Sequence, residues 1–206
     1  MSWDAVQTKK FLSVLAEVMA EQKDELIELD SKVGDGDLGL TMSDGFAAAS
    51  SGAEAKEEED VGKLLYFAGK AMAAKVPSTM GTLMANGLMS AGKALKGRTT
   101  LDNAGICDMM QAWEDGVRKM GKAQEGEKTF LDGLAPGVRA MKENAEKSEK
   151  EMAKAGAQAA EAGAQNTVGM LAVHGRAAIR GEESRKLLDP GAVVASLIMK
   201  ALAQSL

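Results

Sequence analysis

Apolar residues recur at every third or fourth position along most of the chain, a spacing that places them on one buried face of an α-helix. The clearest example is the run Ile106, Met109, Met110, Trp113, Val117 and Met120. No segment has the pattern of a convincing strand. An all-α protein is therefore predicted, with eight helices over residues 3–29, 40–53, 61–72, 79–97, 106–120, 131–141, 148–173 and 190–202.

Helix-start signals support several of these boundaries. Asp60 can cap the helix over 61–72 because its carboxylate can accept the free N–H groups of the first turn. Pro77 breaks that helix, and Ser78 or Thr79 can cap the next one. The helix pattern and the capping residues therefore agree in this part of the chain.

The other two prolines also mark boundaries. Asp189-Pro190 has the form of an N-cap followed by proline at the first helical position. Pro136 falls inside the helix over 131–141, where it either kinks the helix or marks its true start. The polar segment 180–187 predicts a loop. Because the connections are short, neighbouring helices are expected to be antiparallel.

Composition agrees with a helical domain and excludes several functions. Of the 206 residues, 45% are hydrophobic but only 3% are aromatic, and 14 are methionines, which favour helix over strand. The length predicts one domain, residues 1–206. A net charge of −5 argues against a nucleic-acid-binding protein, which would carry a basic stripe. A single cysteine excludes an internal disulfide scaffold.

Targeting signals and nucleophiles are also scarce. The N-terminus lacks the pattern of a secretory leader, and no apolar run approaches the ~18 residues that a membrane span needs. We therefore expect a cytoplasmic protein with no membrane partner. With one histidine and one cysteine, the chain offers little for nucleophilic catalysis.

The most informative segment is the acidic loop that follows the first predicted helix. It carries Asp30, Asp35 and Asp37 among three glycines, which let the backbone bend so that the carboxylates converge. Converging carboxylates repel one another unless a cation neutralises them, and such oxygen ligands suit Mg²⁺, Ca²⁺ or Mn²⁺. An EF-hand is excluded because Thr41 or Phe46 stands where its bidentate glutamate is required. The pattern favours an open metal–phosphate site, with a solvated acidic turn as the alternative.

Two glycine motifs match nucleotide-binding patterns only literally. Gly34-x-Gly36-x-x-Gly39 follows a predicted helix, whereas a dinucleotide-binding motif follows a strand. Gly87-x-x-x-x-Gly92-Lys93 lacks the Ser or Thr that binds Mg²⁺ in a P-loop. We interpret neither motif as a phosphate site.

Other segments offer better phosphate ligands. Residues 78–82 place hydroxyls at a predicted helix start, where free N–H groups bind anions. Arg176 and Arg180 offer the forked contacts that phosphate accepts. Taken singly, a plain N-cap and solvated arginines explain these residues as well.

Four motifs occur in one order along nearly the whole chain. They are the aspartate triplet in its Val-Gly-Asp-Gly-Asp-x-Gly context, Gly126-x-Lys128-Thr129-x-Leu131-Asp132, Gly175-Arg176-Ala177 and Asp189-Pro190-Gly191-Ala192. In this combination the chain resembles the family of ADP-binding L subunits of bacterial dihydroxyacetone kinase (DhaL). Each motif alone is weak, but together they are highly specific.

The resemblance implies a closed barrel of eight antiparallel helices with a nucleotide site at one end. It implies that Asp30, Asp35 and Asp37 hold two Mg²⁺ ions, which bridge the phosphates of ADP or ATP, and that no further catalytic residue is needed. The nucleotide-contacting residues that it implies are Leu38, Gly39, Leu40, Thr41, Ser78, Thr79, Gly121, Thr129, Arg176, Asp189, Pro190 and Gly191.

The resemblance also implies an activity and two partners. The chain would be a phosphotransferase subunit that passes a phosphoryl group to dihydroxyacetone, or a similar small ketose, held on a separate K-type subunit. A phosphocarrier (M-type) subunit of the phosphotransferase system would rephosphorylate the bound nucleotide. Phosphoryl transfer depends mainly on positioning and charge neutralisation, which agrees with the scarcity of nucleophiles.

Two departures from the family pattern leave the substrate and the phosphate donor open. Leu38 stands where the family often has His, and residues 76–81 replace a glycine-rich Ser-Gly-Pro segment. One alternative is an ATP-dependent kinase subunit for another ketose, and another is a non-catalytic nucleotide-binding regulator. A structural helical domain and a lipid binder with an apolar barrel interior are further alternatives.

Overall fold

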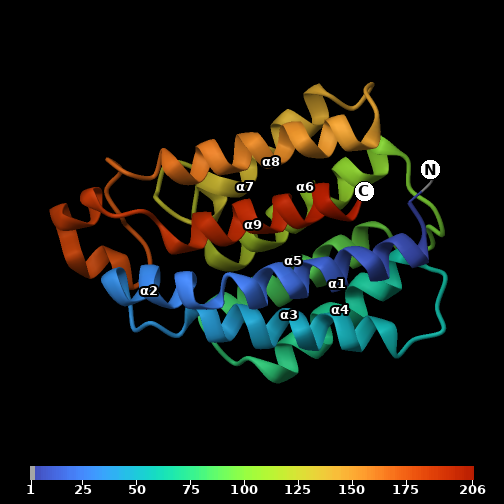
Figure 1. Cartoon of the computed structure of the whole chain (residues 1–206), viewed down its shortest axis with the longest axis horizontal. Coiled ribbons are helices and arrows are strands. Elements are labelled where there is room, and N and C mark those ends of the chain that lie inside the picture. Colours follow the sequence, from blue (N-terminus) through green and yellow to red (C-terminus); the bar gives the residue numbers. More distant parts are fainter. Residues whose placement is uncertain (1–2) are drawn as a thin grey trace.

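Nine α-helices and one 3₁₀-helix make up most of residues 3–206, the part of the chain that the computed structural model describes (Figure 1). They are α1 (Ala5–Glu21), α2 (Lys23–Val33), α3 (Leu38–Glu54), α4 (Val61–Lys75), α5 (Thr79–Ala94), α6 (Asn103–Gly121), α7 (Phe130–Glu143), α8 (Glu149–Gln165), η1 (Arg176–Lys186) and α9 (Pro190–Ser205). The only β-type pairing in the described residues is an isolated antiparallel bridge between Trp3 and Leu101. The all-α prediction is confirmed.

The helices close into a ring. Going round it, α1 packs on α3, α3 on α4, α4 on α5, α5 on α6, α6 on α7 and α7 on α9, and α9 returns to α1. α8 packs against both α7 and α9, and α2 extends the α1 side toward one end of the barrel (Figure 1). The expected barrel is therefore confirmed: α1 and α3–α9 form the ring or pack on it, and the described residues add α2 and the 3₁₀-helix η1 at one end.

Apolar side chains fill the interior of the barrel. They form one continuous core that draws on every α-helix from α1 to α9. Phe46 of α3 and Trp113 of α6 have ring centroids 6.4 Å apart. α5 approaches the Trp113 ring so closely that a Cβ atom on Gly87 would lie 2.1 Å from it. Because the interior is filled, the groups available to a ligand lie in the polar loops at the ends of the barrel.

Three predicted helix boundaries were wrong. The helix expected over 3–29 is interrupted at Gln22, so α1 and α2 are separate helices. The helix expected over 148–173 ends at Gln165, shortly before Gly169 adopts a φ of 97° that right-handed helix does not allow. The segment 180–187 belongs largely to η1, in which Gly181 forms a break, and is not an irregular loop.

Most predicted caps were correct. The side chains of Asp60, Ser78 and Asp189 accept N–H groups from the first turns of α4, α5 and α9. Pro136 lies inside α7, which begins at Phe130, so it does not mark the start of that helix. Cap chemistry is local, and for that reason the sequence predicts it well.

The start of α1 and the end of α9 lie at one end of the barrel, and the α2–α3 loop and η1 lie at the other (Figure 1). The Gln7 side-chain amide of α1 donates to the Ser205 carbonyl oxygen of α9 over 2.7 Å. No single helix in residues 3–206 is long and apolar enough to cross a membrane; only η1 and α9 taken together meet the length and composition required, and they are bent by 86°.

Candidate metal centre

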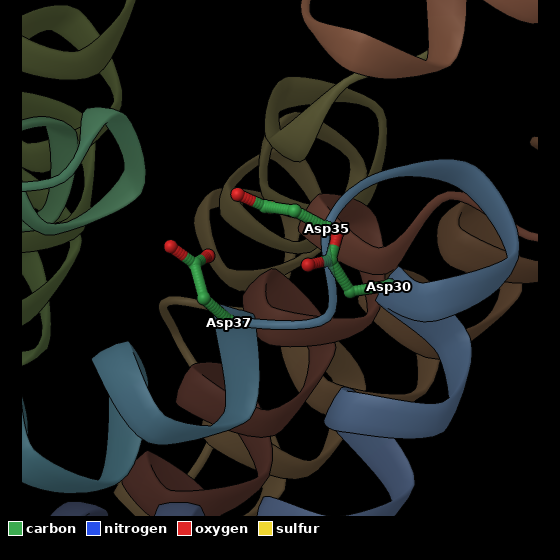
Figure 2. A group of neighbouring side chains, drawn as sticks. All are labelled: Asp30, Asp35 and Asp37. Atoms are coloured by element: carbon green, nitrogen blue, oxygen red, sulfur yellow. The ribbon is translucent and has the colours of Figure 1, made fainter.

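Three carboxylates meet where α2 passes into α3 (Figure 2). Asp30 lies in the last turn of α2, Asp35 lies in the connecting loop, and Asp37 is the N-cap residue of α3. One oxygen from each carboxylate lies within 4.8 Å of the other two. The side chain of Asp37 makes no capping hydrogen bond, so the helix leaves its carboxylate for another partner. The predicted convergence of the three aspartates is therefore seen in the structure.

Short-range backbone contacts hold this turn. The Gly34 N–H donates to the Asp30 carbonyl oxygen over 2.5 Å and ends α2. Gly36 has a φ of 77°, a conformation that few residues other than glycine adopt easily. The Leu38 N–H, at the start of α3, donates to Asp30 Oδ2 over 3.3 Å. The Asp30 carboxylate therefore lies at the N-terminal end of α3.

The cluster carries more negative charge than the protein neutralises. Arg176 of η1 places Nη2 2.7 Å from Asp35 Oδ2; the Arg176 side chain is largely exposed and that of Asp35 is partly exposed. Burial, and then the charges of Asp35 and Asp30, raise the pKa of Asp37, while Arg176 lowers it. One arginine opposes three carboxylates, so a divalent cation would relieve the remaining repulsion. All-oxygen donors on a partly open surface fit Mg²⁺ or a similar hard cation.

A groove of about 310 Å³ opens beside Asp37. Thr41 of α3 lines it from one side and Ser78, the N-cap of α5, lines it from the other. The groove therefore joins the aspartate cluster to a helix N-terminus, which is an anion-binding arrangement. The other lining residues are Leu40, Asp44, Lys75, Val76 and Pro77.

The predicted nucleotide residues of α3 and α5 divide between this groove and the core. Leu40, Thr41 and Ser78 line the groove, and Thr79 is exposed in the first turn of α5. Leu38 and Gly39 are buried in helix packing. Sequence reasoning missed Asp44 and Lys75, because the only signal for them is their position one or two turns from predicted site residues.

A second group of predicted residues meets where α7 and α9 begin. Thr129 caps α7, and Asp189 caps α9 by accepting the Ala192 N–H over 2.8 Å. Pro190 is buried, and a Cβ atom on Gly191 would lie 3.2 Å from the Phe130 nitrogen, so the two helix starts are in contact. Burial raises the pKa of Asp189 to about 6.

The remaining predicted residues are more scattered. Gly121 is exposed in the last turn of α6, where a Cβ atom would lie 3.3 Å from the Leu83 side chain of α5. Arg176 reaches the acidic cluster directly, as described above. Sequence reasoning also gave no role to Lys128, which stands in one of the four motifs and is only 2% exposed.

Comparison with known proteins identifies the family. Residues 32–204 match the family model described as the DAK2 domain. The chain belongs to the DAK2 family. The DAK2 match covers most of the chain, including Asp35, Asp37 and every predicted nucleotide-contacting residue.

DAK2 relatives extend this match to both ends of the chain. The ADP-binding subunit DhaL of PEP-dependent dihydroxyacetone kinase 1 from Listeria innocua is 31% identical over 205 residues, covering 100% of this chain and 98% of the relative. The L-erythrulose 1-kinase of Mycolicibacterium smegmatis is 32% identical over 95% of this chain, which spans only 34% of that larger protein. The resemblance to the DhaL family is therefore confirmed.

A solved DAK2 structure agrees with the fold. The dihydroxyacetone kinase of C. freundii, in complex with AMP-PNP and Mg²⁺, superposes with a TM-score of 0.72 at 24% identity. The match covers 97% of this chain and 34% of that chain. At this level of identity, the match supports the helical barrel and not the chemistry.

Proposed function

We propose that this chain is the nucleotide-binding subunit of a dihydroxyacetone-kinase-type phosphotransferase, forming a single domain over residues 1–206. The observation that carries the proposal is the meeting of three carboxylates at the start of α3, beside a groove that ends at the α5 N-terminus. Family membership supports it, because the Listeria innocua relative is named as an ADP-binding subunit.

In this proposal Asp30, Asp35 and Asp37 hold two Mg²⁺ ions, which supply charge neutralisation for the nucleotide phosphates. The groove residues then bind along the nucleotide. Thr41 and Ser78 offer hydroxyls, and the first N–H groups of α5 face anionic oxygens. Arg176 exchanges its contact with Asp35 for a phosphate contact when the cations bind, because its guanidinium is exposed and forked.

The second group of residues closes the site. Thr129 and Gly121 contact the base side of the nucleotide, and residues 189–191 close over it together with Arg176. Leu38 and Gly39 are buried and support the site through helix packing. No catalytic side chain beyond the metal ligands is proposed, because phosphoryl transfer is governed by positioning and electrostatics.

The relatives' names support the proposed partners. The relative from Listeria innocua is called PEP-dependent, and one from Lactococcus lactis is called PTS-dependent. We therefore propose a phosphocarrier (M-type) subunit as the phosphoryl donor and a K-type subunit as the holder of dihydroxyacetone. We also propose that the chain and these partner subunits act in the cytoplasm.

A second candidate is an ATP-dependent subunit for another ketose. It is favoured by the 32% identity to an L-erythrulose 1-kinase and by the Leu38 and 76–81 departures noted above. The two candidates differ in whether the nucleotide stays bound. ADP that stays bound is expected if a phosphocarrier subunit rephosphorylates it in place. A nucleotide that exchanges with solution is expected if ATP is the phosphoryl donor.

The deciding experiment measures bound and added nucleotide. The purified chain is denatured and its supernatant chromatographed, and Mg–ADP and Mg–ATP binding are then measured by calorimetry. Stoichiometric ADP supports the carrier-dependent candidate, and binding only of added Mg–ATP supports the second. Asp35→Asn is expected to abolish binding, while Asp115→Asn on the exposed face of α6 is expected to leave it unchanged. Absence of any Mg²⁺-dependent nucleotide binding would overturn the proposal.

A further inference from the structure

Lys128 is a buried lysine in the loop before α7. It is 2% exposed and has a φ of 59°, which is unusual for a residue with a side chain. A lysine is almost never buried without partners, because its ammonium group loses its hydration. The partners of Lys128 therefore identify what its burial accomplishes.

Those partners are the two ends of one segment. Lys128 Nζ donates to the carbonyl oxygen of Thr167 over 2.6 Å and to that of Leu187 over 2.5 Å. We call residues 167–187 the strap; it runs from just after α8 to just before α9 and contains η1. A single ammonium group thus binds both ends of a segment of the chain.

Hydrogen bonds also join the first part of the strap to its last part. The Gly169 N–H donates to the Arg185 carbonyl oxygen over 2.7 Å, and Arg185 Nη1 returns a bond of 2.8 Å to the Gly169 carbonyl oxygen. The Ala172 N–H donates to Ser184 Oγ over 3.0 Å. These bonds join the two halves of the strap, so that it can move as one unit about its base.

Away from its base, the strap meets the rest of the molecule through a few small contacts. Val33 of α2 packs with Ala172 and Ala177 in a small cluster separate from the main core. Arg176 pairs with Asp35, and His174 Nε2 lies 2.6 Å from Glu127 Oε2; all four side chains are at least one-third exposed. Exposed ion pairs contribute little to stability, whereas a charge-assisted hydrogen bond in a buried site is strong. The bonds of Lys128 are therefore the buried charged attachment of the strap, beside a neutral bond from the Asp189 N–H to the Thr167 hydroxyl at its base.

The charges around Lys128 fit this role. Burial lowers the pKa of Lys128, while the carboxylates of Asp189 and Asp132 act to keep it charged. Asp132 in turn accepts the N–H groups of Gly126 and Thr129 over 2.5 and 2.7 Å. The ammonium group is thus compensated on one side by carboxylates and on the other by the two strap carbonyls.

We infer that Lys128 is a positioning residue of the nucleotide site: its buried ammonium group anchors both ends of the strap and thereby places Arg176 against the aspartate cluster. This inference rests on the proposed function for the part that concerns the nucleotide. It assigns Lys128 no contact with substrate, nucleotide or metal. Its effect passes through the strap alone.

The test compares Lys128→Met and Lys128→Gln with Lys142→Met, a change at a lysine of α7 that bonds only Gln111 at the surface. Hydrogen exchange of peptides from the strap, Mg–ADP affinity, and Mn²⁺ binding without nucleotide are measured. In both Lys128 variants we expect faster exchange confined to the strap and Mg–ADP affinity weakened at least ~10-fold. Mn²⁺ binding is expected not to weaken, because the three aspartates lie on α2, α3 and their loop. Lys128→Arg is expected to recover part of the Mg–ADP affinity.

A merely structural lysine would give a different result. Its replacement would speed exchange throughout the barrel and weaken the binding of Mn²⁺ and of Mg–ADP together, and that result would overturn the inference. Folded variants with unchanged exchange in the strap would also overturn it. If neither Lys128 variant folds, the wild type decides: the hydrogen-bonded amides of Gly169, Ala172 and Leu187 must share one free energy of opening, and unrelated opening free energies would refute a shared anchor. Failure of the wild type to bind Mg–ADP would count against the proposed function and leave the exchange result on the strap standing.

Discussion

Asp37 belongs to the aspartate cluster but lowers the stability of the metal-free fold. It occupies the N-cap position of α3 but makes no capping hydrogen bond. Burial and the neighbouring carboxylates of Asp35 and Asp30 raise its pKa. A raised carboxyl pKa means that the folded protein holds the ionised form less well than the unfolded chain does, so ionised Asp37 destabilises the metal-free fold at neutral pH.

Asp37→Asn is therefore expected to change stability and binding in opposite directions. The melting temperature of the metal-free protein should rise slightly, by about 1–2 °C, because exposure screens most of the repulsion. Mg²⁺-dependent ADP binding should weaken at least ~10-fold. Differential scanning calorimetry with EDTA and titration calorimetry with Mg²⁺ measure the two effects. A lower melting temperature, or Mg–ADP binding equal to that of the wild type, would contradict this reading; Asp115→Asn is the control.

Elements were predictable wherever their signals are local. The caps at Asp60, Ser78 and Asp189 rest on contacts within three residues, and the sequence identifies all three. The convergence of the aspartates was predictable for the same reason, since glycines separate them by a few positions. The C-terminal end of α8 and the course of the strap were not predictable, because the bonds of Lys128 reach carbonyls 39 and 59 residues away.

The acidic turn also depends on how α2 and α3 pack. A Cβ atom at Gly39 would lie 2.1 Å from the Lys23 carbonyl oxygen and 2.8 Å from the Ile27 side chain. The backbone oxygen cannot move aside as a flexible side chain would. The absence of a side chain at Gly39 thus lets α3 start directly against α2 and sets the separation of Asp30 from Asp37.

Gly39→Ala is expected to push the two helices apart. We expect a loss of about 1–3 kcal/mol in the free energy of unfolding, the usual cost of overpacking, and weaker binding of Mn²⁺. Urea unfolding and electron paramagnetic resonance of added Mn²⁺ measure these two quantities. Ala47→Ser, on the exposed side of α3, should alter neither. Wild-type Mn²⁺ affinity in Gly39→Ala would show that the helix contact does not set the site.

At the scale of the whole molecule, one buried carboxylate shapes the pH dependence of stability. Burial raises the pKa of Asp189 from 3.8 to about 6. Between these two values the folded protein binds more protons than the unfolded chain, so the free energy of unfolding falls as the pH rises through this range. The difference corresponds to about 3 kcal/mol at most.

Asp189→Asn should remove most of this slope while keeping an oxygen to accept the Ala192 N–H. Urea unfolding from pH 4 to pH 7.5 is expected to give a flatter profile than the wild type. Asp102→Asn serves as the control: Asp102 is the exposed N-cap of α6, its pKa is lowered, chiefly by the Gly105 N–H, and its effect falls below about pH 4. A wild-type slope in Asp189→Asn would show that other groups dominate the profile.

The hydrogen bond between Gln7 and Ser205 has a topological consequence. It joins α1 to α9 side by side at the end of the barrel opposite the α2–α3 loop (Figure 1). When the first and last elements of a fold are adjacent, circular permutation is tolerated. A short linker from residue 206 to the start of the chain, with new ends opened in the exposed 55–59 connection, would keep every helix neighbour and leave the acidic turn uncut. The barrel is in this sense a closed cycle of helices whose starting point is arbitrary.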